Sequence, residues 1–250
     1  MTQHSVSQAA EAMARTGQVS QIVASKLTQS DRSVQVAEVK RGFDDPVMSC
    51  FVIDASPSMA PFRNDVIQAQ HVMVNTLRGS AKAINNALYV AQWLFSGTAT
   101  ILNPFTILNP TGTDSVTLLD TANYKPDDGD GTALYTTVFQ VLQDMAANIA
   151  YSYARNIRAT FTIGVITDGD DNKPGALPGD IKAIVQELKA KGYINSSVII
   201  GIENPGLSRA KINEIKDKIG FDEAIFVGQS ASEIRRAFAL ASKSAINGQS

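Results

Sequence analysis

The sequence is poor in the residues that build disulfides and histidine-rich centres. It has one cysteine, Cys50, and two histidines, His4 and His71, among 250 residues. A single cysteine cannot form an internal disulfide, and its place within an apolar run favours a small buried side chain over a reactive thiol. Two histidines far apart in sequence do not suggest a zinc site. We therefore expect neither a disulfide scaffold nor a zinc centre.

The sequence also lacks an excess of charge of either sign and any long apolar run. Its formal net charge is −2, which argues against nucleic acid or an anionic membrane as a partner. The longest apolar runs fall well short of a bilayer span, and residues 1–17 have no apolar segment typical of a secretory signal. These absences predict a cytoplasmic protein.

From residue 46 onward, short apolar runs alternate with amphipathic helical patterns. With 44% hydrophobic residues, the chain can build a central sheet covered by helices. This alternation is typical of an α/β fold with a doubly wound, mostly parallel central sheet and helices on both faces, as in Rossmann-like proteins. Strands are predicted at 47–54, 88–95, 99–102, 159–168, 197–202 and 224–227, with a weaker run at 116–119, and helices at 63–78, 132–155, 181–191, 207–219 and 232–244.

The first 45 residues form a separate segment by composition. Residues 5–28 are rich in Ala, Gln and Ser and contain short helical patterns, and residues 33–40 alternate imperfectly, which favours an edge strand. We expect residues 1–45 to form an N-terminal arm, helical or partly disordered, that packs on the domain at 46–250 or contacts a partner.

Oxygen-bearing side chains gather where the predicted strands end. One strand ends in Asp54 and is followed by Ser56 and Ser58, within the stretch DASPS. A second strand ends in Asp168, and a glycine-rich turn places Thr132 at the start of the longest helix. Ligands of open α/β sheets bind outside the carboxyl ends of the strands, so we expect these five side chains to lie close together. Two carboxylates and three hydroxyls suit Mg²⁺, with Mn²⁺ as a second possibility.

The charge of this set favours binding over catalysis. Two carboxylates balance a divalent ion, while hydroxyls and water add no formal charge. If one carboxylate acts through water, the ion stays electrophilic at an open position, which an acidic side chain of another protein could fill. The pattern thus indicates a binding device.

Each of these residues also has an ordinary structural interpretation. Ser56 and Ser58 suit helix capping and turns, Thr132 suits the N-cap of the long helix, and Asp168 suits a turn before Gly169. Their joint occurrence at strand ends is what favours a metal site.

This combination resembles the metal-ion-dependent adhesion site of von Willebrand factor A domains. In that family D-x-S-x-S follows an apolar strand, a later Gly-Thr opens a helix, and a second apolar strand ends in T-D-G. The resemblance covers roughly residues 46–244 and includes all five ligand positions. It implies a Mg²⁺-dependent, non-enzymatic module for protein–protein interaction, in which an Asp or Glu of a partner binds the ion.

The lack of a signal, span or disulfide makes the chain similar to the intracellular bacterial-type members of that family. This resemblance implies work in a multiprotein complex, often with an AAA-type ATPase as partner. Loop residues near the motifs are candidates for contact with the partner; they are Pro57, Met59, Phe62, Arg63, Tyr135 and Asp170.

Two other functions compete with this interpretation. The stretch DGDGT at 128–132 resembles the nucleophile motif of haloacid-dehalogenase-type phosphatases. That metal-dependent chemistry needs Asp128 at the end of an apolar strand, whereas the preceding residues ANYKPD are polar and contain a proline. The other alternative is a structural subunit that assembles through its arm, with an ion that only stabilises the fold.

Overall fold

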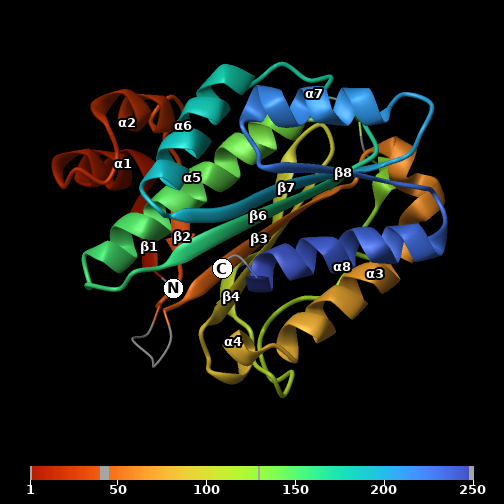
Figure 1. Cartoon of the computed structure of the whole chain (residues 1–250), viewed down its shortest axis with the longest axis horizontal. Coiled ribbons are helices and arrows are strands. Elements are labelled where there is room, and N and C mark those ends of the chain that lie inside the picture. Colours follow the sequence, from red (N-terminus) through yellow and green to blue (C-terminus); the bar gives the residue numbers. More distant parts are fainter. Residues whose placement is uncertain (1, 40–44, 129, 170, 248–250) are drawn as a thin grey trace.

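The chain folds around a six-stranded sheet with helices on both faces (Figure 1). The computed structural model describes residues 2–39, 45–128, 130–169 and 171–247. The strand order is β5-β4-β3-β6-β7-β8, and only β5 runs antiparallel to its neighbour. The predicted fold class is therefore confirmed. The strands are β3 (Val47–Asp54), β4 (Leu88–Phe95), β5 (Ala99–Ile107), β6 (Thr160–Thr167), β7 (Ile194–Ile202) and β8 (Glu223–Val227).

The central strand β3 shows why its sequence is apolar throughout. All eight of its residues are buried, because both faces of the sheet are covered. Met48, Cys50 and Val52 pack in the core on one face, and Phe51 and Ile53 pack in the core on the other. The first face is covered by α5 (Leu134–Tyr153), α6 (Pro178–Ala190) and α7 (Arg209–Ile219), and the second by α3 (Arg63–Arg78) and α8 (Ala231–Asn247); the short α4 (Ala81–Ile84) follows α3. Within the described ranges, every helix is too short or too polar to cross a bilayer.

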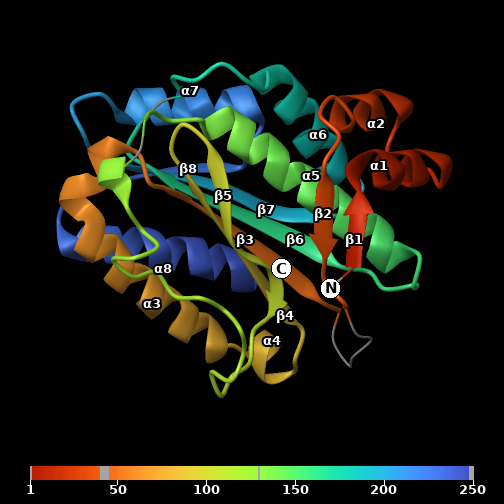
Figure 2. The same ribbon diagram turned by 180° about the vertical axis from the view of Figure 1, so that it is seen from behind.

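The N-terminal segment packs against α5 and α6 (Figure 2). Its two strands pair antiparallel, and apolar residues of its helices, including Met13, Val23 and Leu27, are buried in the same core cluster as α5. Arg32 fastens the segment to α5, since its guanidinium donates to Asp144 and lies 5.3 Å from the centre of the Trp93 ring. The predicted division of the chain into an arm at residues 1–45 and a domain at 46–250 stays a prediction. The elements are β1 (Thr2–Ser5), α1 (Val6–Arg15), α2 (Gln21–Leu27) and β2 (Ser33–Val36).

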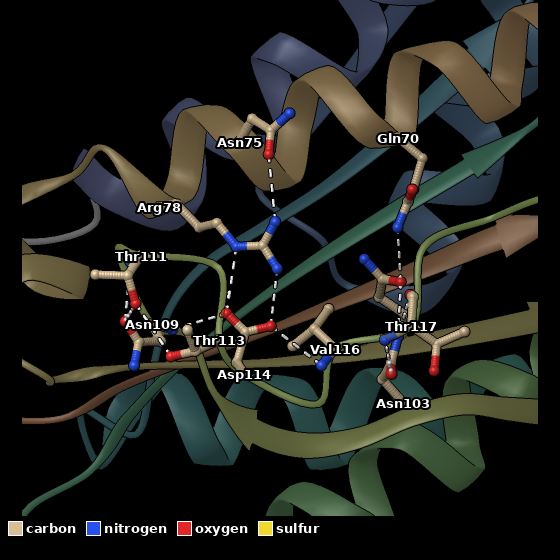
Figure 3. A network of polar contacts seen from close by, with 11 residues as sticks. Gln70, Asn75, Arg78, Asn103, Asn109, Thr111, Thr113, Asp114, Val116 and Thr117 are labelled. Atoms are coloured by element: carbon tan, nitrogen blue, oxygen red, sulfur yellow. Dashed lines mark hydrogen bonds and ion pairs between the residues drawn. The ribbon is translucent and has the colours of Figure 1, made fainter.

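The predicted strand at 116–119 is wrong, because side chains replace a neighbouring strand there (Figure 3). Asn103 of β5 both donates to the carbonyl of Thr117 and accepts from its N–H, at 2.8 Å each. Gln70 of α3 accepts from the N–H of Leu119 at 3.2 Å. The segment is therefore a loop held by buried amides, and its apolar residues still enter the core.

The same loop is tied to α3 by a buried ion pair, also drawn in Figure 3. Arg78 donates to both carboxylate oxygens of Asp114, at 2.8 and 3.2 Å. Asp114 also accepts from the N–H groups of Asn109 and Val116, at 3.0 and 3.1 Å. These bonds fix the irregular chain between β5 and the 3₁₀ turn η2 (Pro126–Asp128), which approaches the carboxyl end of the sheet.

The Asp144 carboxyl makes the stability of this protein depend on pH. Burial raises its pKa from 3.8 to about 7, although Arg32 opposes the shift. Between pH ~4 and pH ~7 the folded protein keeps a proton on Asp144 that the unfolded chain has released. The contribution of this proton to folding stability is therefore full below pH ~4 and is lost as pH rises through ~7. The stability of wild type relative to Asp144→Asn should therefore fall by about 2 kcal/mol from pH 5 to pH 8.

Urea unfolding of both proteins at the two pH values measures this difference. Other titrating groups cancel in the comparison, because the variant retains them. An identical change with pH in both proteins would show that Arg32 keeps Asp144 ionised throughout.

Candidate metal centre

The two predicted carboxylate ligands lie side by side at the carboxyl edge of the sheet. Asp54 is the last residue of β3, and Asp168 directly follows β6. These strands are parallel neighbours in register, with Ile53 opposite Ile166. Both aspartates are completely buried. The expectation that the two strand ends meet is confirmed.

A chain of hydrogen bonds connects four of the five predicted ligands. One Asp54 oxygen accepts from the N–H of Ser56 at 2.7 Å, and the other accepts from the Thr167 hydroxyl at 2.5 Å. The hydroxyls of Ser56 and Ser58 are 3.1 Å apart, and Ser58 donates to Asp168 at 2.7 Å. The loop that leaves β3 thus turns its oxygen atoms toward the neighbouring strand end.

Thr132, the fifth predicted ligand, is brought to the same edge by paired loops. Its N–H donates to the side chain of Asn172 at 2.8 Å, and its carbonyl accepts from the N–H of Asn172 at 3.0 Å. Its hydroxyl lies 3.7 Å from the position that a Cβ on Gly169 would occupy. The preceding Gly131 has φ +148°, a conformation that favours glycine. The loops after Gly131 and after Asp168 therefore share one surface.

The capping roles considered for Ser56 and Thr132 are absent from the structure. Ser56 precedes the 3₁₀ helix η1 (Pro57–Phe62), but its side chain makes no capping bond. The long helix begins at Leu134 rather than at Thr132, and its N-cap is Ala133. Asp168 accepts from Ser58 and from the Asn204 amide at 3.0 Å. The capping hydrogen bonds expected of Ser56 and Thr132 are not made.

Several supporting residues escaped the sequence analysis. The Tyr124 hydroxyl donates to the backbone carbonyl of Asp54 at 2.7 Å, although it comes from the long loop after β5. Asp171 accepts from the N–H of Tyr135 in the first turn of α5 at 3.0 Å. Their neighbours in sequence gave no sign of these contacts, except that Asp171 and Asn172 follow the T-D-G motif. The residues missed are Tyr124, Thr167, Asp171, Asn172 and Asn204.

The electrostatics of this edge suit a cation. Burial raises the pKa of Asp54 to about 6, the nearby Asp168 carboxylate adds to the rise, and bonds from Thr167 and Ser56 oppose it. Within the described ranges, neither aspartate forms an ion pair with a basic side chain. Two adjacent buried carboxylates without a cation are costly, which a bound divalent ion would relieve.

The donor set also limits which ion fits. Among the residues that the structure describes, no three or more His, Cys, Asp or Glu side chains are grouped to hold a metal. A metal here would depend on serine and threonine hydroxyls as well as the two carboxylates. Such an all-oxygen set is typical of hard divalent ions such as Mg²⁺.

The predicted partner-contact residues divide by exposure. Pro57 is exposed, and Phe62 and Arg63 are half-buried. Met59 and Tyr135 are 0% and 9% exposed and pack in the core, and contact of a partner with either of them stays a prediction. Asp170 lies outside the described residues. Of the five predicted ligands only Ser58 is exposed, so the site opens on its side.

The phosphatase alternative lacks the geometry that it requires. Asp128 ends the short 3₁₀ turn η2 and is exposed, so no strand aims it at a substrate. The phosphatase-like stretch instead supplies Gly131 and Thr132 to the edge described above.

A family model for the von Willebrand factor type A domain matches residues 50–239. Solved structures with the same fold include a von Willebrand factor type A protein from Catenulispora acidiphila, with a TM-score of 0.55 and 14% identity over 80% of this chain and 43% of that one. Another is proximal thread matrix protein 1 from the mussel byssus, described with a zinc-occupied MIDAS motif, with a TM-score of 0.57 and 18% identity over 81% and 48%.

The PilB minor pilin from Streptococcus sanguinis is also similar, with a TM-score of 0.55 and 16% identity over 84% of this chain and 63% of that one. At these identities the likeness concerns the fold. The chain spans less than half the length of the first two structures. No curated protein sequence matches the chain.

We expect the hydrogen bond from the Thr167 hydroxyl to the Asp54 carboxylate to stabilise the folded chain. Thr167→Val keeps the shape of the side chain but leaves one buried carboxylate oxygen without its donor, which should lower the free energy of unfolding by about 1–3 kcal/mol. Thr167→Ser retains the hydroxyl and should lose less. Urea unfolding at pH 7.5 in EDTA compares the two, and equal losses would assign the effect to packing of the methyl group.

Proposed function

This chain belongs to the von Willebrand factor type A family, and we propose that it is a metal-dependent module for protein–protein interaction. The observation that carries the proposal is the hydrogen-bonded series from Asp54 through Ser56 and Ser58 to Asp168. It joins two buried carboxylates through two hydroxyls, and the Ser58 residue within the series is exposed. A set of oxygen donors with an exposed edge is suited to binding rather than to turnover.

The residues of this edge would hold an ion in two ways, directly and through water. The hydroxyls of Ser56, Ser58 and Thr132 would bind it directly, and Asp54 and Asp168 would bind it or hold waters around it. Mg²⁺ is the preferred ion, with Mn²⁺ as an alternative. A bound divalent ion supplies an electrophilic position that an Asp or Glu of a partner can occupy. Thr167 and Asn204 would orient the two carboxylates through their hydrogen bonds.

The surface beside the ion would select the partner. A hollow of about 190 Å³ adjoins Ala55, between the metal-binding loop and the β4–β5 turn. Its lining includes Asn123 and two exposed residues of opposite charge, Lys125 and Asp128. An acidic partner with one carboxylate at the ion would place a second acidic group near Lys125. The half-buried Phe62 and Arg63, where η1 ends and α3 begins, would add further contacts.

The proposed setting is a cytoplasmic multiprotein complex, with an AAA-type ATPase as the expected class of partner. This assignment rests on the resemblance to intracellular bacterial-type members of the family. Assembly through the N-terminal segment is less favoured, since its apolar residues Met13, Val23 and Leu27 are already buried against the rest of the chain.

Metal affinity should depend on a hydroxyl at the edge of α5. Thr132→Val keeps the side-chain volume but removes one oxygen donor, so Mn²⁺ affinity measured by calorimetry should fall by about tenfold or more. Thr76→Val is the matched control, because this exposed hydroxyl bonds only its own helix, at Val72. Equal Mn²⁺ affinity in all three proteins would remove Thr132 from the ligand set.

Recognition through the ion should appear as capture that needs both magnesium and the hydroxyls. Immobilised wild type is expected to retain a partner from native lysate with Mg²⁺ and to lose it in EDTA. Folded Ser58→Ala and Thr132→Val should also lose it, while Thr76→Val should keep it. If metal binds but capture is unchanged by EDTA and by these substitutions, the ion serves stability and the partner binds elsewhere.

A further inference from the structure

A second cavity lies at the opposite end of the sheet from Asp54, at the amino ends of β6 and β7. Its volume is about 400 Å³, which falls within the range of small-molecule sites. It is formed where the last turn of α5 meets the loop before β6 and the turn between α6 and β7. Its lining residues are Ile149, Tyr153, Asn156, Ile157, Arg158, Ala159, Lys191 and Tyr193.

The lining combines apolar surface with positive charge. Ile149, Ile157 and two tyrosines provide surface for a flat apolar group, and no acidic side chain lines the cavity. Arg158 is exposed, and its guanidinium makes no hydrogen bond or ion pair with any described residue. Lys191 donates to the carbonyl of Gly17 at 3.0 Å, a neutral acceptor that leaves its charge uncompensated.

One wall of the cavity is held in place by the N-terminal segment. Gln18 donates to the hydroxyl of Tyr193 at 3.1 Å, and Lys191 is held by Gly17. The backbone of Tyr193 is fixed at both ends, because its N–H donates to Leu188 at 2.8 Å and its carbonyl accepts from Phe161 at 2.7 Å. A wall fixed in this way loses little freedom when a ligand binds.

The opposite wall is formed by the turn after α5, which contains Asn156 and Ile157. Asn156 adopts φ +56°, and the carbonyl of Ser152 accepts from the N–H of Ile157 at 3.0 Å, so the chain leaves α5 with its last carbonyls largely bonded. The side-chain hydroxyls of Ser152 and Thr160 are buried without a partner. They adjoin the lining residues Tyr153 and Ala159 in sequence but do not line the cavity themselves.

We infer that this cavity binds a small organic anion with a flat apolar body and one carboxylate. The apolar body would pack against the tyrosines and isoleucines, and the carboxylate would pair with Arg158 and Lys191. A guanidinium matches a carboxylate with two parallel hydrogen bonds, which favours this group over a neutral one. The apolar lining disfavours a bare inorganic anion. The inference is independent of the metal edge, since it uses none of its residues.

Matched probes test the charge requirement directly. Naphthalene-2-carboxylate and its neutral analogue naphthalene-2-carboxamide would be titrated into the full chain by calorimetry, in EDTA so that no metal ion captures the carboxylate. The carboxylate should bind about tenfold or more tightly than the amide, as expected for a charge-assisted hydrogen bond. Arg158→Gln should abolish this preference.

Two further variants make the outcome decisive. Arg155→Gln is the matched control, since this nearby arginine stacks on Tyr151 and does not line the cavity, and it should keep the preference. Tyr153→Ala should weaken both probes. Absence of saturable binding, equal binding of the two probes, or an unchanged preference in Arg158→Gln would each overturn the inference. The last result would assign Arg158 to offsetting the partial negative charge at the ends of α5 and α6.

Discussion

The rest of this structure is organised around two carboxylates that are buried next to each other and form no ion pair with a basic side chain of the described residues. Parallel pairing of β3 with β6 brings Asp54 and Asp168 together at one edge of the sheet. Burial raises the pKa of Asp54, and repulsion from the neighbouring Asp168 carboxylate adds to the rise. Such an arrangement persists only if hydrogen bonds, protons or a bound cation compensate for it, and the surrounding loops are built to supply those hydrogen bonds.

That support reaches well beyond the edge itself. Tyr124 holds the backbone of Asp54 from a loop that is in turn tied to α3 by Arg78 and Asp114. The side-chain carbonyl of the buried Gln92 also accepts hydrogen bonds from Gln70 and from Asn103, each at 2.9 Å. These polar groups fix irregular chain segments where a regular sheet would leave backbone groups unpaired. The loops that carry the oxygen donors are therefore anchored to α3 and β5, on rigid parts of the fold.

The two ends of the sheet have opposite character. The carboxyl end concentrates acidic and hydroxyl oxygens, while the cavity at the amino end combines the cations Arg158 and Lys191 with apolar surface. The N-terminal segment packs on α5 and α6 and also contacts β5, and its Gly17 and Gln18 hold the cavity wall. Its packing gives the segment a structural role in the folded chain.

The sequence by itself determined the fold class, the bounds of β3, α3 and β4, and the oxygen residues that the sheet brings to its carboxyl edge, because continuous apolar runs and helical periodicity report burial directly. It failed at 116–119, where Asn103 and Gln70 take the place of a strand, and it did not reveal the burial of Met59 and Tyr135, which depends on neighbours far away in the chain. Only the tertiary structure decided that Tyr124, Thr167 and Asn204 support the carboxylates, and that Arg158 lines a cavity. Such contacts join residues distant in sequence, and no local pattern of polarity encodes them.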